Sequence, residues 1–128
     1  MIVKEYPLVT YAIDSDDIVI STITNVKHLD LQSAEELVRS RLDFMLDKKH
    51  YILIDMSKIQ KFTLEAKHYM QDPEKGLKNI LGAAFIASNP ISILIANVFI
   101  KTRSNFPTKF FSGKNEALKW IKDIKNCK

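Results

Sequence analysis

Residues 52–70, ILIDMSKIQKFTLEAKHYM, carry the pattern that decides the fold. An apolar run ends at Asp55, a short polar stretch follows, and an apolar periodicity of three to four residues begins after Thr63. Threonine is a good N-cap, because its hydroxyl accepts a hydrogen bond from a free backbone N–H of the first helical turn. The stretch therefore predicts a buried strand, a turn and a helix, the repeating unit of a mainly parallel sheet.

A hairpin and a helix are predicted before this unit. Residues 8–13 and 17–23 are rich in strand-forming residues, and the turn-forming cluster DSDD at 14–17 separates them. Residues 30–49 predict a helix with Asp30 as its N-cap. Its apolar positions recur every three or four residues and form one stripe, made of Leu31, Ala34, Leu37, Val38, Leu42 and Met45.

The alternation continues after residue 70. Asp72-Pro73 predicts a restart or kink of the helix, because proline is favoured at the first helical position. Residues 81–88, LGAAFIAS, predict a buried strand. Residues 108–111, TKFF, predict the last strand, and a final helix is expected to begin at Ser112 or Gly113.

Residues 89–102, NPISILIANVFIKT, fit two structures. Their isoleucines and valine have strand propensity, whereas the Asn89-Pro90 start and the length favour a helix. Parallel strands need a crossover long enough to hold a helix, and this segment lies between two predicted strands. The topology therefore favours a helix.

The predicted order is β-β-α-β-α-β-α-β-α over a single domain, residues 1–128. Such alternation predicts an α/β fold, with a mainly parallel five-stranded sheet covered by about four helices. A chain of 128 residues is long enough to bury one core without disulfides.

Composition narrows the class of protein. Hydrophobic residues make up 46% and charged residues 27%, as in ordinary globular proteins. The longest apolar run, residues 91–100, is shorter than the about 20 residues that span a bilayer. The first residues lack the basic-then-apolar pattern of an export signal. With Cys127 as the lone cysteine, a reducing cytoplasm is expected.

The net charge of +4 is concentrated near the end of the sequence. Residues 101–128 contain eight Lys or Arg against Glu116 and Asp123. On the predicted last helix, however, basic and acidic side chains share one polar arc, which is typical of a solvated face. No stacking-aromatic pattern or known reading motif accompanies the lysines, so nucleic-acid binding is not expected.

The element order, with ILIDMS before a capped helix, resembles the STAS fold of anti-sigma-factor antagonists and sulfate-transporter cytoplasmic domains. Residues 106–121, FPTKFFSGKNEALKWI, look like the end of small uncharacterised bacterial STAS-like proteins. The matching residues are Pro107, Thr108, Lys109, Phe111, Glu116, Ala117, Leu118 and Trp120. The resemblance implies a regulatory, non-catalytic module that binds a protein partner.

The phosphorylation switch of that family is not matched. In the phosphorylated antagonists the strand is followed by D-x-S and then D-S-S-G, and Asp55 and Ser57 match the first part. The second part reads Thr63, Leu64, Glu65, Ala66. The switch serine is therefore expected to be absent, with Glu65 as a permanent negative charge in its place. The alternative interpretation of Thr63 is an ordinary N-cap.

Candidate binding residues lie where the strand ends, the edge at which open α/β sheets bind ligands. They could contact an anionic group or the acidic surface of a partner, and they are Asp55, Ser57, Lys58, Lys61, Thr63, Glu65 and Lys67. The alternative is a polar turn whose Asp and Ser bond to nearby backbone N–H groups.

No catalytic residues, metal ligands or cofactor are predicted. His28, His50 and His68 lack the spacing of a metal site, and no nucleophile elbow is recognisable. The sequence contains no phosphate-binding glycine motif.

The segment from residue 91 to 100 suggests self-association. A helix that is apolar nearly all round must be covered on more than one side. A homodimer is predicted through Ile91, Leu94, Ile95, Val98 and Phe99, and the alternative cover is the final helix with Trp120. A different class of function also stays open, a binder of a small lipophilic or anionic ligand in a cavity beside this helix.

Overall fold

The computed structural model describes residues 2–100 and 106–127, apart from the side chains of residues 98–100. The strand–turn–helix unit at its centre consists of β5 (His50–Asp55) and α2 (Leu64–Gln71). Thr63 caps α2 as predicted, because its Oγ1 accepts a hydrogen bond from the backbone N–H of Ala66 at 3.1 Å.

The elements before β5 are β1 (Ile2–Glu5), β2 (Val9–Ile13), β3 (Val19–Ile23), β4 (His28–Leu29) and α1 (Leu31–Phe44). The predicted hairpin is confirmed as β2 and β3. Asp14 closes its turn, since Asp14 Oδ1 accepts from the N–H groups of Asp16 and Ile18 at 2.9 and 3.0 Å. Asp30 caps α1 in a reciprocal box with Ser33.

The elements after β5 are β6 (Lys61–Phe62), α2, β7 (Ile80–Ile86), α3 (Pro90–Ile100), β8 (Thr108–Phe111) and α4 (Lys114–Asn126). The ambiguous segment is therefore a helix, as its topology predicted. Asn89 caps it: Asn89 Oδ1 accepts from the N–H of Ser92 at 2.8 Å, and Ser92 Oγ accepts from the N–H of Asn89 at 3.2 Å.

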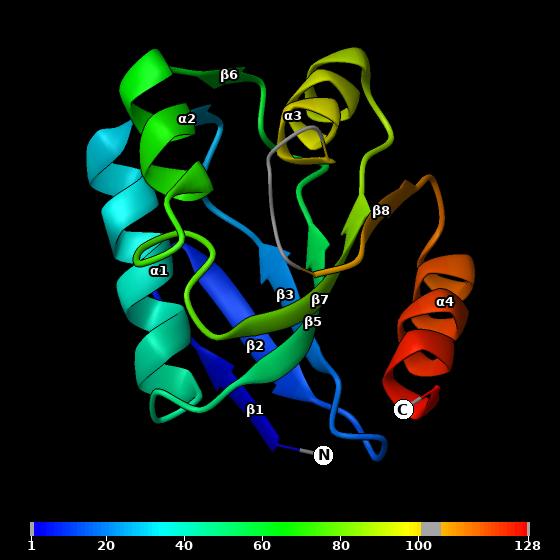
Figure 1. Cartoon of the computed structure of the whole chain (residues 1–128). Helices are drawn as coiled ribbons and strands as arrows, with labels where there is room; N and C mark the ends of the chain where they lie inside the picture. Colours follow the sequence, from blue (N-terminus) through cyan, green and yellow to red (C-terminus); the bar gives the residue numbers. More distant parts are fainter. Residues whose placement is uncertain (1, 101–105, 128) are drawn as a thin grey trace.

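Six strands form the main sheet, in the order β1-β2-β3-β5-β7-β8. The first three pair antiparallel, and β3, β5, β7 and β8 pair parallel. The short strands β4 and β6 form a separate parallel pair. The carboxyl ends of the parallel strands therefore meet at one edge, beside β6 and the beginnings of α2 and α3 (Figure 1).

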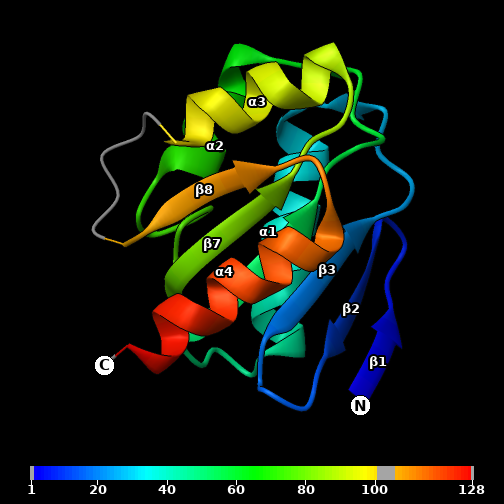
Figure 2. The same cartoon turned by 90° about the vertical axis from the view of Figure 1, so that its right-hand side faces the viewer.

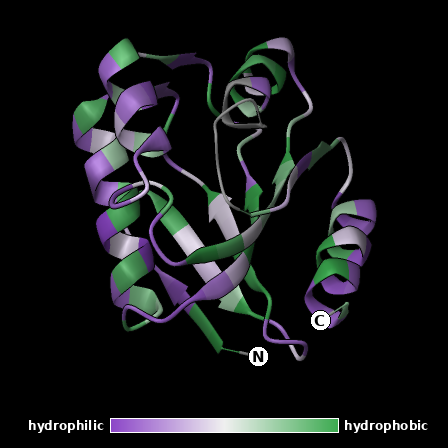
Figure 3. Cartoon of the chain, in the orientation of Figure 1, coloured by the Kyte–Doolittle hydropathy of each residue, from purple (hydrophilic) through white to green (hydrophobic). Residues whose placement is uncertain are grey.

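Helices cover both faces of the sheet. In Figure 1, α1 and α2 lie on one face and α4 on the other, while α3 lies at the carboxyl end of the parallel strands. Figure 2 shows α4 in front of the sheet. Two hydrophobic clusters follow this division: a larger one beneath α1, α2 and α3, and a smaller one beneath α4. In Figure 3, hydrophobic residues run along the central strands and α3.

The α/β class with a mainly parallel sheet is confirmed, and four details differ from prediction. The main sheet has six strands, because residues 2–5 pair with β2. Residues 28–29 and 61–62 pair outside it. The first long helix ends at Phe44, where Leu46 and Asp47 adopt positive φ and turn the chain back toward β5. Residues 73–79 form turns, so the helix does not restart at Pro73. No helix in the described ranges is long and apolar enough to cross a bilayer.

Candidate functional site

The rim, which we define as residues 55–67, is the polar segment at the carboxyl end of β5. It begins with a tight turn, in which Asp55 Oδ1 accepts from the N–H of Ser57 at 3.0 Å. Met56 and Ile59 are buried beneath it. Asp55 thus makes the local backbone contact that the polar-turn alternative described.

Two neighbouring segments, residues 27–29 and the start of α3, hold the rim by hydrogen bonds. The carbonyl of Lys27 accepts from the N–H groups of Gln60 and Lys61 at 2.7 and 3.0 Å. The N–H of Thr63 donates to the carbonyl of Leu29 at 3.0 Å. The side-chain amide of Asn89 donates to the carbonyl of Ser57. These bonds give the rim a defined backbone from which side chains project.

The predicted rim residues differ in accessibility. Lys58, Lys61 and Glu65 are exposed, whereas the other four are partly buried: Asp55, Ser57, Thr63 and Lys67. Within the described residues, no ion pair joins the exposed three to one another. The rim therefore presents charges of both signs to solvent.

Leu64 was missed by the sequence analysis. Its side chain is 64% exposed in the first turn of α2, between Lys61 and Glu65. Its exposure could have been predicted from the spacing of the apolar residues. Ala66, Tyr69 and Met70 mark the inward side of the helix, and Leu64 falls outside that spacing. Ala66, which stands where the phosphorylated antagonists have a glycine, is fully buried. Leu64 is thus a large apolar group in the middle of a charged surface.

The interior contains a small apolar cavity of about 50 Å³ between the sheet and the layer formed by α1, α2 and residues 72–79. Its walls include Ile23, Leu37, Ile54, Met70, Gly76, Leu77, Ile80, Ala83, Phe85 and Phe106. An engineered cavity that admits benzene measures about 150 Å³. The cavity is therefore apolar, as a ligand binder would require, but too small for an acyl chain in this conformation.

A second cavity of about 40 Å³ adjoins the first, and the two share six lining residues: Ile23, Leu37, Ile54, Met70, Gly76 and Ile80. Its other walls include three polar side chains, those of Tyr11, Ser21 and Arg41. An open surface groove of about 710 Å³ is also present, lined by residues 7–8, residues 25–28 and the first half of α1 with its cap. Its lining residues carry charges of both signs: Lys27 and Arg39 are basic, and Asp30, Glu35 and Glu36 are acidic.

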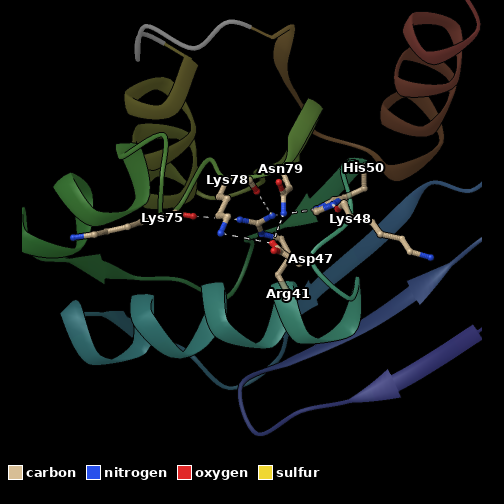
Figure 4. A network of polar contacts seen from close by, with 7 residues as sticks. All are labelled: Arg41, Asp47, Lys48, His50, Lys75, Lys78 and Asn79. Carbon is tan, nitrogen blue, oxygen red and sulfur yellow. Dashed lines mark hydrogen bonds and ion pairs between the residues drawn. The ribbon is translucent and has the colours of Figure 1, made fainter.

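Arg41 lies at the centre of a buried polar network, drawn in Figure 4. Its Nη1 donates to the carbonyl of Lys78 at 2.7 Å and to His50 Nε2 at 3.1 Å. Its Nη2 donates to the carbonyls of Gly76 and Lys75 at 3.2 and 3.4 Å. Arginine can only donate, so His50 Nε2 accepts, and His50 Nδ1 carries the proton that it donates to the carbonyl of Lys48 at 2.8 Å.

Burial shifts the pKa values of both residues. Loss of hydration disfavours the charged imidazolium and lowers the pKa of His50 to about 4. The same effect lowers the pKa of the Arg41 guanidinium. His50 is thus neutral at pH 7. His28 and His68 are exposed, and the described residues contain no His, Cys, Asp and Glu group able to hold a metal ion.

Within the described residues, part of one side of α3 is exposed. Ile91 and Leu94 are 37% and 51% exposed, whereas Ile95 is buried in the larger cluster. The side chains of Val98 and Phe99, also predicted to mediate self-association, lie outside the described residues. Trp120 packs in the other cluster, 5.8 Å from the ring of Phe111.

Comparisons with known proteins identify a family and a fold. The model of a family described as "Domain of unknown function (DUF7793)" matches residues 11–125. A similar solved structure is that of an uncharacterized protein of the DUF3478 family with a SpoIIAA-like fold, from Shewanella loihica PV-4. It superposes with a TM-score of 0.62 at 20% identity, over 88% of this chain and 91% of that one. No curated protein matches the sequence. The STAS-like fold predicted from the sequence is thus supported.

Proposed function

The chain belongs to the DUF7793 family, and from this premise and its STAS-like fold we propose that it is a non-catalytic regulatory module that binds a protein partner through the rim. The observation that carries the proposal is the exposure of Leu64 among Lys58, Lys61 and Glu65. Protein interfaces commonly combine an apolar anchor with a polar border. The partner then has an apolar pocket bordered by charged groups.

The hydrogen bonds that hold the rim backbone in place support the same function. Because the rim is bonded to Lys27, Leu29 and Asn89, little ordering is needed when a partner docks. We further propose that this binding takes place in the cytoplasm, the compartment that a lone cysteine favours. The site comprises Leu64 together with the predicted residues Asp55, Ser57, Lys58, Lys61, Thr63, Glu65 and Lys67.

A photo-crosslinking amino acid at position 64 tests the proposal in the native cells. Position 46 is the matched control, because Leu46 is also a strongly exposed leucine, 74% accessible, at the far end of α1. We expect a discrete crosslinked protein from position 64 alone, and its loss when Lys61→Glu and Glu65→Lys are combined with the probe. Equal crosslinking from both positions would contradict a specific partner site at the rim.

The rim acts without a phosphorylation switch. The Thr63 hydroxyl is engaged as the cap of α2, and Glu65 supplies a fixed negative charge in the first turn, where the helix dipole favours an anion. Mass spectrometry of protein from its native cells is the test. Phosphothreonine at position 63 would show that the switch is retained.

Self-association through α3 is a second interaction that this chain makes. This proposal is supported by Ile91 and Leu94, which are exposed, whereas Ile95 on the other side of α3 is buried. We expect a dimeric mass at high protein concentration and a monomeric mass for Leu94→Glu. A strictly monomeric wild-type protein would rule the dimer out.

Binding of a small lipophilic or anionic ligand is the alternative function. One observation favours it, the pair of adjoining cavities with apolar walls beneath α2. Native mass spectrometry of gently purified protein reports both a retained ligand and the number of subunits.

A further inference from the structure

The two interior cavities are adjacent and share part of their lining, as two parts of one site would. Six side chains or backbones border both of them, and together the cavities extend from Phe85 and Phe106 at one end to Arg41 at the other. The first cavity is lined almost entirely by aliphatic and aromatic groups. The second contains the polar corner, which we define as Tyr11, Ser21 and Arg41. An apolar pocket with a few converging polar groups is the usual form of a small-molecule site.

The polar corner is fully removed from solvent. None of its three residues is more than 4% exposed. The Tyr11 hydroxyl donates to the carbonyl of Leu37 at 3.1 Å, and Ser21 lines the same cavity. Burial raises the pKa of Tyr11, so its hydroxyl stays protonated, and this single proton would turn from the Leu37 carbonyl to reach an oxygen of a ligand. The corner thus combines two hydroxyls with one cation.

The charge of Arg41 is not compensated by an acid. Within the described residues, its hydrogen-bond acceptors are backbone carbonyls and the neutral His50, and no carboxylate forms an ion pair with it. A buried cation with neutral partners alone is costly, and a bidentate carboxylate is the partner that best fits a guanidinium. The corner therefore favours an anion with two oxygens.

Arg41 also holds the wall that closes the site. Its carbonyl acceptors belong to Lys75, Gly76 and Lys78, which lie in the covering segment, residues 72–79. Gly76 and Leu77 of that segment line the first cavity. A carboxylate at Arg41 competes with these carbonyls for the same N–H groups. Its binding would therefore loosen the covering segment and enlarge the space beneath it.

We propose that the two cavities are the closed form of one binding site for a small apolar carboxylic acid, whose carboxylate binds the Arg41 corner and whose tail lies between Met70 and Phe85. The inference rests on the alternative function, ligand binding, and is independent of the partner site at the rim. Each cavity is smaller than the about 150 Å³ that admits benzene, so binding of such an acid requires the covering segment to move aside.

Calorimetric titration of the whole protein with octanoate and with octan-1-ol at pH 7 tests the proposal. The two probes share a tail and differ in charge. We expect octanoate to bind with one-to-one stoichiometry and at least tenfold more tightly than octanol, because only the acid gains charge-assisted hydrogen bonds from Arg41. Equal affinity for both, or no binding of octanoate, would overturn the proposal.

Three variants locate the site. Arg41→Gln is expected to remove the preference for the acid and leave octanol binding in place. Tyr11→Phe keeps the ring and is expected to weaken the binding of octanoate but not that of octanol. This variant replaces Arg41→Gln as the test if Arg41→Gln does not fold. Ala83→Val adds two methyl groups to the floor of the first cavity on a β-strand and is expected to abolish binding of both probes. Octanoate binding that survives Ala83→Val lies elsewhere and contradicts the proposal.

Failure of this titration leaves the rim proposal standing, because the crosslink from position 64 depends on an exposed side chain outside both cavities.

Discussion

The side-chain amide of Asn89 donates a hydrogen bond to the backbone carbonyl of Ser57, so one residue joins the start of α3 to the rim. The same side chain caps α3 by accepting from the N–H of Ser92. A hydrogen bond thus joins the segments that follow the neighbouring parallel strands β5 and β7. The Asn89 amide thus adds to the bonds by which the carbonyls of Lys27 and Leu29 hold the rim.

Asn89→Ala is expected to lower the free energy of unfolding by about 2 kcal/mol, about 1 from the lost cap and about 1 from the lost bond to Ser57. Asn89→Ser keeps a cap acceptor and lacks the amide, so its loss is expected to be about half as large. Urea unfolding of both variants measures these values. Asn115→Ala, at an exposed position of α4, is the control. Equal losses for Ala and Ser at position 89 would contradict a role for the cap.

His50 is expected to make stability fall as the pH is lowered from about 6.5 to about 4. The pKa of His50 is about 4 in the folded protein and near 6.5 in the unfolded chain, so in this interval the unfolded chain binds a proton that the folded protein does not. The stabilisation is complete above pH 6.5 and is lost toward pH 4, with a maximum size of about 3 kcal/mol.

Urea midpoints at pH 7, 6 and 5 check this dependence, since most carboxylates have not yet begun to titrate in that range. His50→Gln keeps a hydrogen-bonding side chain beside Arg41 and lacks the titration. We expect its midpoint to change little over the interval. A slope equal to that of the wild type would assign the dependence to other groups.

Gly76→Ala is expected to destabilise the protein by about 3 kcal/mol, as overpacking of a closed interior does. A Cβ on Gly76 would lie 2.1 Å from the carbonyl oxygen of Met70, and backbone cannot rotate away as a side chain can. Gly113→Ala is the control, since a Cβ there would meet its nearest heavy atom, Glu116 Oε1, at 3.9 Å. Thermal unfolding of both variants measures the difference. A Gly76→Ala protein as stable as the wild type would show that the covering segment moves freely.

Elements with strong local signals could be predicted from the sequence. The β5–α2 unit has an unbroken apolar strand and a threonine cap, and α3 has an Asn-Pro start, so backbone and cap preferences agree with the topology. In contrast, all four residues of β1 are exposed, and their strand exists through pairing with β2. No burial pattern marks such a strand. The two-residue strands β4 and β6 are too short to leave any pattern.

The buried polar network around Arg41 was not predicted, because arginine is a residue type usually found at the surface. Arginine is rarely buried, so Arg41 reads as a surface residue of α1. Its spacing of four from Leu37 and three from Val38 nevertheless puts it on the buried stripe, which is the signal that identifies it. Its partners at residues 75–78 could not be predicted, because they are backbone carbonyls brought there by the fold.

Replacing a leucine with glycine is expected to have opposite effects at positions 46 and 64. Both side chains are strongly exposed, 74% and 64%, so little packing is lost at either. Leu46 has φ 51°, a left-handed conformation that costs a non-glycine residue about 1 kcal/mol, and Leu46→Gly is expected to stabilise the protein by about 0.5–1 kcal/mol. Leu64 is helical, and Leu64→Gly is expected to destabilise it by a similar amount, about 0.5–1 kcal/mol. Urea unfolding of the two variants measures the change in the free energy of unfolding. Changes of the same sign would refute backbone conformation as the cause.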